Sequence, residues 1–184
     1  AVSIDVVDEA LPEVDLEVRI PEPYEATYSD PRDLGNEYRC FYLDPADEDI
    51  YIRGLHPVID NPAMVHHTVL FTVPDGDVPE DIGPDGEDCL GMGTAADGMI
   101  AAWAPGMLPV ELPDGAAIEV PEGRTLVLQM HYFDAAGEGA TDQSGYAFDL
   151  VSADEVTDEV IMLPLGATSF RIPADDPAYT HTEE

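Results

Sequence analysis

Short runs of alternating apolar and polar residues recur along the chain, with turn residues between them. Successive side chains of a β-strand point to opposite faces, so these runs predict half-buried strands. No stretch repeats apolar residues with a helical period between capping residues. The pattern therefore predicts an all-β fold, an antiparallel, jelly-roll-like β-sandwich. Strands are expected at residues 38–43, 49–54, 64–73, 99–103, 116–120, 124–133, 146–151, 160–165 and 169–172, after an edge strand at 16–20.

The same pattern predicts a single domain, and 184 residues are enough for a two-layer core. Residues 1–37 are rich in Pro, Glu and Asp and should form an extended lead-in that contains the edge strand. Residues 38–172 should form the sandwich. Residues 173–184 return to the Pro, Asp and Glu composition, and we expect a surface tail or the start of a further domain there.

The charge of the chain is extreme, with 40 acidic residues against six basic ones, all of them arginine. Phosphate contacts need a basic surface, so nucleic acid is excluded as a partner, and anionic membranes are disfavoured for the same reason. No apolar stretch reaches the length of a membrane-spanning helix, so no membrane insertion is expected. The acidic surface has two interpretations: ordinary solubility, or a halophilic host in which salt screens the self-repulsion.

Histidines are concentrated in the two most strand-like segments. The apolar run 64–71 contains His66 and His67, and the run 126–133 contains His131, which together are three of the five histidines. An imidazole is poorly suited to a core unless it is hydrogen-bonded or bound to metal. Three neutral imidazoles from two strands would suit copper or zinc. The competing interpretation is that each is an ordinary core histidine with a hydrogen-bond partner.

The adjacent pair raises a geometric problem. Neighbouring residues of a regular strand point to opposite faces, so His66 and His67 can share one metal only at a bulge, a twist or a strand end. His131 should share its face with Gln129, which makes that face the more polar one. A further histidine, His56, lies near the pair in sequence, precedes Pro57 and is expected at the surface or in a turn. Met162 is expected in the core.

The chain has two cysteines, Cys40 and Cys89. Two are too few for a disulfide scaffold, and no C-x-x-C pair occurs. Either they form one disulfide in an exported protein, or they are two buried free thiols. The chain begins at Ala1 without a basic and apolar leader, which fits a mature exported product.

Several motifs, in this order, resemble one enzyme family: the type II copper, ascorbate-dependent monooxygenases, which include peptidylglycine alpha-hydroxylating and dopamine beta-monooxygenases. The resemblance is to their N-terminal copper domain, especially in bacterial members, and covers residues 38–133. The segments that carry it are Tyr38-Arg39-Cys40-Phe41, Tyr51-Ile52-Arg53-Gly54, Asn61-Pro62-Ala63-Met64-Val65-His66-His67, Cys89-Leu90-Gly91, Ala102-Trp103-Ala104-Pro105-Gly106, Leu112-Pro113-Asp114-Gly115 and Leu126-Val127-Leu128-Gln129-Met130-His131-Tyr132.

The resemblance implies that His66, His67 and His131 bind one electron-transfer copper, with ascorbate as the electron donor. It also implies a Cys40–Cys89 disulfide, export from the cell and a jelly-roll-like sandwich.

Family enzymes have a second domain, whose His-x-His pair and methionine bind the oxygen-activating copper. After His131 this chain contains only His181. We therefore expect it to bind copper but not to hydroxylate a substrate alone, and to act as an enzyme only with a second copper-bearing domain or partner. Two alternatives remain: a stand-alone exported copper carrier, sensor or electron shuttle, and a β-sandwich interaction module without metal.

Overall fold

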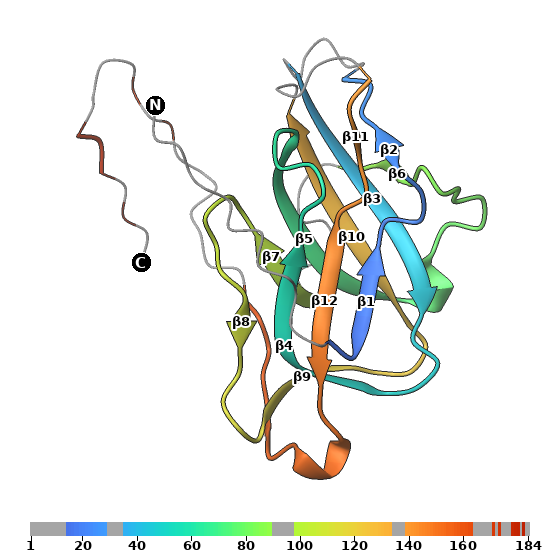
Figure 1. Ribbon diagram of the computed structural model, residues 1–184, viewed down its shortest axis with the longest axis vertical. Helices are drawn as coiled ribbons and strands as arrows, with labels where there is room; N and C mark the ends of the chain where they lie inside the picture. Colours follow the sequence, from blue (N-terminus) through green and yellow to red (C-terminus); the bar gives the residue numbers. More distant parts are fainter. Residues whose placement is uncertain are drawn as a thin grey trace.

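Two mainly antiparallel β-sheets packed face to face make up the body of the protein, seen here in a computed structural model (Figure 1). The structure describes residues 14–28, 35–89, 98–133 and 139–163, and isolated positions between 171 and 182. Within these residues the only helical segments are two single turns, Asp75–Asp77 and Ala153–Glu155. The predicted all-β sandwich is confirmed.

The six-stranded sheet has the order β1-β12-β4-β9-β13, with β8 paired to β4. All its pairings are antiparallel except that of β13 with β9. The edge strand predicted at residues 16–20 is present as β1 at one end of this sheet. Its strands are β1 (Leu16–Arg19), β4 (Ile50–Val58), β8 (Val110–Glu111), β9 (Ala116–Val120), β12 (Gly145–Leu150) and β13 (Asp158–Glu159).

The five-stranded sheet has the order β6-β3-β10-β5-β7 and is antiparallel throughout. Figure 1 shows β5 and β10 behind the β4 and β12 strands of the other sheet. A small third sheet pairs β2 (Tyr24–Glu25) with β11 (Thr141–Asp142). The strands of the five-stranded sheet are β3 (Asn36–Pro45), β5 (Val65–Pro74), β6 (Glu87–Asp88), β7 (Met99–Trp103) and β10 (Arg124–Phe133).

Strand β10 separates the main core from the outer face of the five-stranded sheet. Its alternate residues Leu126, Leu128, Met130 and Tyr132 belong to the core cluster between the sheets. Val127 belongs to a second, smaller cluster, with Cys40 and Val69, on the other face. His131 lies two positions from Gln129 and four from Val127, so it also belongs to this outer face.

Most predicted strands are present, but the one predicted at residues 160–165 is wrong. The chain pairs with β9 two residues earlier, at Asp158–Glu159. The last ladder contact is the hydrogen bond that Val160 N donates to Ala117 O over 2.8 Å. Ile161 and Leu163 then expose 68% and 63% of their surface, so the described residues 160–163, called the strap below, do not form a strand. The strand predicted at 169–172 lies outside the described residues, apart from Arg171.

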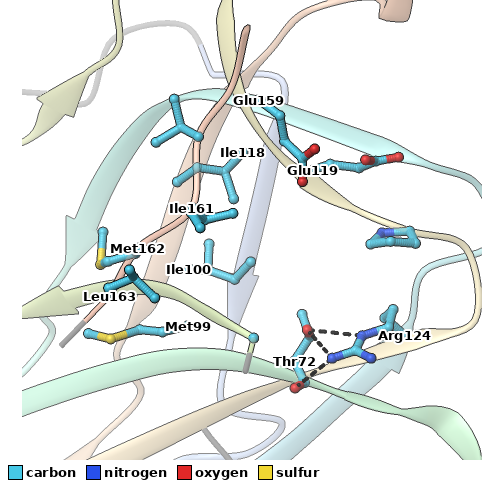
Figure 2. A pocket seen from close by; sticks show the side chains of 13 residues that line it. Thr72, Met99, Ile100, Ile118, Glu119, Arg124, Glu159, Ile161, Met162 and Leu163 are labelled. Carbon is cyan, nitrogen blue, oxygen red and sulfur yellow. Dashed lines mark hydrogen bonds between the residues drawn. The ribbon is translucent and has the colours of Figure 1, made fainter. Parts of the chain in front are cut away.

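The strap closes one side of a pocket of about 400 Å³ at the edge of the sandwich. Figure 2 shows Met162, Met99 and Ile100 on one wall, and Arg124 opposite them with three hydrogen bonds to Thr72. Met162 is half-buried here, so its predicted core position is wrong.

The predicted division into lead-in, sandwich and tail stays a prediction, although β1 and β2 lie before residue 38 and pair within the sheets. In the described part of the chain, no helix has both the length and the apolar character that crossing a membrane requires.

Candidate metal centre

A register shift between β5 and β10 brings the two neighbouring histidines together. His131 pairs with His67, but the next residue of β10, Tyr132, pairs with Val65. His66 is therefore the extra residue of a β-bulge and has no partner on β10. A bulge re-aims the side chain of the extra residue, which resolves the problem that an adjacent pair poses in a regular strand. Of the three arrangements that the sequence allowed, a bulge, a twist or a strand end, the structure has the bulge.

The three imidazoles converge through their Nδ1 atoms. His67 Nδ1 lies 3.2 Å from His66 Nδ1 and 3.1 Å from His131 Nδ1. One nitrogen from each ring lies within 4.8 Å of the others, and this is the only such group of metal-binding side chains among the described residues. Two nitrogens bound at 2.0–2.1 Å to a tetrahedral ion would be about 3.3 Å apart. The two separations measured from His67 Nδ1 are close to that value.

Exposure differs sharply among the three residues. His131 is only 5% exposed, His67 is half-buried and His66 is exposed. The cluster thus has a fixed side within the sheet and an open side at His66, where a small molecule or a protein could approach.

Burial keeps the inner two rings uncharged. It is the largest cause that lowers the pKa of His131 to about 4, followed by repulsion from His67 and then His66. The pKa of His67 is also lowered, first by burial and then by His66. Near neutral pH both rings are therefore unprotonated and present nitrogen lone pairs.

This donor set fits a copper ion. Neutral imidazole is a good ligand for copper, and the affinity order of divalent ions favours copper over zinc. Among the described residues, no carboxylate or thiol joins the group. Without a cation, the lone pairs of converging nitrogens would oppose one another, since His67 Nδ1 can share only one proton with its two neighbours.

Strand β3 supplies two residues that hold the His131 ring. Tyr38 pairs with His131 in the ladder, and the two rings stack with centroids 4.1 Å apart and planes within 6°. Asn36 lies two residues before Tyr38, on the same face, and its Oδ1 is 2.8 Å from His131 Nε2. The sequence analysis missed both roles. Tyr38 stood in a recognised motif, but the predicted strand began after Asn36, and nothing in the sequence paired β3 with β10.

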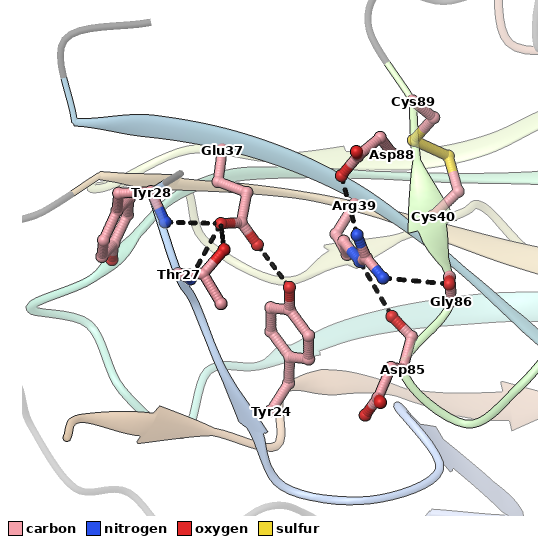
Figure 3. A network of polar contacts seen from close by, with 10 residues as sticks. All are labelled: Tyr24, Thr27, Tyr28, Glu37, Arg39, Cys40, Asp85, Gly86, Asp88 and Cys89. Carbon is pink, nitrogen blue, oxygen red and sulfur yellow. Dashed lines mark hydrogen bonds and ion pairs between the residues drawn. A yellow bond between two sulfur atoms is a disulfide. The ribbon is translucent and has the colours of Figure 1, made fainter. Parts of the chain in front are cut away.

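The start of β3 is itself held firmly from the opposite face. The buried Glu37 carboxylate accepts hydrogen bonds from Tyr24 Oη, from Thr27 N over 2.9 Å and from Tyr28 N over 2.7 Å. Figure 3 shows these groups converging on Glu37. Asn36 and Tyr38 flank this residue, so their backbone positions are fixed by its contacts.

The middle of β3 is joined to the segment around β6. Cys40 and Cys89 form a disulfide across 49 residues, with their Cα atoms 5.7 Å apart. Beside it, Arg39 donates hydrogen bonds to Asp85 O and Gly86 O and pairs with Asp88 (Figure 3). Gly86 has a positive φ of 62°, and a Cβ there would lie 2.1 Å from Cys40 O. Only glycine allows so close an approach of the loop to β3.

Comparison with known proteins agrees with this geometry. The family described as copper type II ascorbate-dependent monooxygenase, N-terminal domain, matches residues 30–138, which is more than half of the 184-residue chain. The chain belongs to this family. The matched region includes all three clustered histidines and both cysteines. A search of curated proteins found no match. The copper type II monooxygenase family is copper-dependent, and a three-histidine cluster that could hold the ion lies within its N-terminal domain here.

The predicted surface position of His56 is wrong. His56 is 4% exposed within β4, and its Nε2 lies 2.8 Å from Asp149 Oδ2 on β12. A Cβ on Gly54 would lie 2.2 Å from the same carboxylate oxygen, so glycine makes room for the pair. His56 pairs with Ala147 in the six-stranded sheet, whereas the histidine cluster lies on the five-stranded one. Its chemistry is that of a buried polar pair outside the metal centre.

Proposed function

We propose that this domain binds one copper ion through Nδ1 of His66, His67 and His131 and transfers single electrons. The observation that carries the proposal is the convergence of three imidazole nitrogens in a domain of a copper monooxygenase family. When bound, copper in a site of neutral imidazoles supplies one-electron chemistry between Cu(I) and Cu(II). The protein residues orient the nitrogens, keep two of the rings unprotonated and leave one side open.

Ascorbate is the electron donor that fits this proposal, because the family is ascorbate-dependent. The exposed His66 gives a small donor access to the ligand set. The buried His131 keeps the opposite side closed and anchored. The oxygen-activating copper of the family would come from a second domain or from a partner protein, and substrate hydroxylation would require that partner.

Export from the cell is part of the same proposal. The Cys40–Cys89 disulfide supports it, because disulfides persist in oxidising compartments and are rare in the cytosol.

Copper titration of the purified protein tests the proposal. The wild-type protein should bind one equivalent of Cu(I) or Cu(II), and ascorbate should remove the electron paramagnetic resonance signal of the bound Cu(II). His131→Ala should lose this binding, because it removes the anchored ligand. His56→Ala is the matched control: it removes the other described buried histidine and should keep one equivalent. Failure of the wild-type protein to bind copper, or equal binding by His131→Ala, contradicts the proposal.

A second candidate function is a stand-alone copper carrier, sensor or electron shuttle. The net charge of −34 favours it, since an acidic surface would steer the domain towards a basic partner protein. The two functions differ in whether the copper ion itself or only an electron leaves the site. A carrier transfers the ion to an acceptor chelator or protein, whereas an electron-transfer domain keeps its ion through repeated cycles of reduction by ascorbate and reoxidation.

A further inference from the structure

Asn36 holds a position that the family motifs did not indicate. It is the first residue of β3, and its side chain lies diagonally across the ladder from His131, because Asn36 pairs with Phe133 and Tyr38 pairs with His131. Diagonal neighbours on one face of an antiparallel pair are within reach of each other's side chains. The contact between Asn36 Oδ1 and His131 Nε2, at 2.8 Å, is of ordinary hydrogen-bond length.

A neutral imidazole carries its proton on one nitrogen and a lone pair on the other. An amide oxygen is only an acceptor, so its contact with Nε2 requires the proton to be on Nε2. The lone pair is then on Nδ1, which is the atom that lies 3.1 Å from His67 Nδ1. The hydrogen bond to Asn36 and metal binding through Nδ1 of His131 therefore require the same tautomer.

We infer that Asn36 is the positioning residue of the metal centre: it selects the Nε2–H tautomer of His131 and thereby commits Nδ1 to copper. The inference rests on the proposed function for the identity of the ion, but the choice of tautomer exists in the metal-free protein as well. Stacking on Tyr38 fixes the plane of the ring. The plane of the ring does not determine which nitrogen carries the proton. The hydrogen bond to Asn36 Oδ1 determines it.

Two features suit Asn36 to this role. Its backbone is next to Glu37, whose hydrogen bonds to Thr27 and Tyr28 fix the start of the strand. Its amide is also neutral. A carboxylate in the same place would draw the proton more strongly and make the imidazole a stronger electron donor, which favours Cu(II) over Cu(I).

The first test uses the metal-free protein. Nitrogen-15 NMR at neutral pH should show His131 of the wild-type protein in the Nε2–H tautomer alone. Asn36→Leu, which offers no acceptor, should give a mixture of tautomers. Asn36→Asp, which keeps an acceptor oxygen, should restore the single tautomer. The control is Phe133→Asp, which alters the directly opposed residue, 43% exposed, and should leave the tautomer unchanged. A single Nε2–H tautomer in Asn36→Leu overturns the inference.

The second test measures Cu(I) and Cu(II) affinities of the same variants. Loss of a hydrogen-bond partner of a ligand histidine typically weakens metal binding about tenfold or more, which we expect for Asn36→Leu. Asn36→Asp should raise the ratio of Cu(II) to Cu(I) affinity on the order of tenfold, equivalent to a potential about 59 mV lower. Phe133→Asp adds the same charge nearby, and an equal shift in that variant contradicts the role of the Asn36 acceptor. If the wild-type protein binds no copper, the proposed function fails, while the tautomer experiment still decides the role of Asn36.

Discussion

The three clustered histidines have unequal freedom, although the family motif treats them as one set. His131 is buried, stacked on Tyr38 and in contact with Asn36, while His66 is an exposed bulge residue. A rigid ligand lowers the entropy lost on metal binding, and an exposed one allows the coordination to adjust. We therefore expect removal of His131 to weaken copper binding more than removal of His66.

Acidification should destabilise the metal-free protein through these rings. Unfolded histidine takes up a proton near its ordinary pKa of 6.5, whereas His131 in the folded protein does so only near pH 4. The pKa of His67 is lowered as well. The free energy of unfolding is therefore highest, as far as these rings affect it, above pH 6.5, and it falls as the pH decreases towards 4.

Urea unfolding between pH 7.5 and 5.5 measures this effect before most carboxylates titrate. The free energy of unfolding should fall across that range in the wild-type protein and fall less in His131→Gln. Equal slopes in the two proteins would show that His131 does not carry the linkage.

His56 gives a second prediction, on stability alone. His56→Ala removes the partner of Asp149 and leaves that carboxylate, which is largely buried, without its 2.8 Å contact. A buried polar group that loses its partner typically costs about 1–3 kcal/mol. Urea unfolding should show a loss of that size, with the copper stoichiometry unchanged. Stability equal to that of the wild-type protein would indicate that the pair contributes nothing net.

Individual strands show what the sequence could and could not predict. The bounds of β7, β9 and β10 were predicted correctly, because their alternation is continuous and turn residues flank them. The bulge at His66 was foreseen as one way to bring adjacent histidines together. Contacts that depend on pairing between distant strands were not predictable. Asn36 reaches His131 only because β3 pairs with β10. His56 contacts Asp149 only because β4 pairs with β12.

The Cys40–Cys89 disulfide closes a long loop, and its removal should lower stability without abolishing the metal centre. A closed loop of 49 residues corresponds to about 4 kcal/mol in the chain-entropy account. The double variant Cys40→Ala/Cys89→Ala should therefore lose about 2–4 kcal/mol in chemical denaturation. The β3–β10–β5 ladder holds the histidines independently of this link, so one equivalent of copper should still bind. Loss of copper binding in a folded double variant would assign the disulfide a direct role at the site.

At the scale of the whole molecule, the net charge of −34 is spread over a surface of 11745 Å². Such a density of like charge opposes the compact state by self-repulsion. Salt shortens the Debye length from about 10 Å at 0.1 M to about 3 Å at 1 M. The thermal unfolding midpoint should therefore rise markedly as KCl is increased over this range.

Variants in which acidic residues are replaced by their amides distinguish the screening of surface charge from a general effect of high salt concentration. Asp44, Asp47 and Glu48 are exposed, and replacing them with Asn, Asn and Gln removes three negative charges. This triple variant should unfold at a higher temperature than the wild-type protein at 0.1 M KCl, and the difference should shrink at 1 M because salt already screens the removed charges. A midpoint that is independent of KCl, or a variant advantage that persists unchanged at 1 M, would mean that self-repulsion does not limit stability and that the acidic surface serves solubility alone.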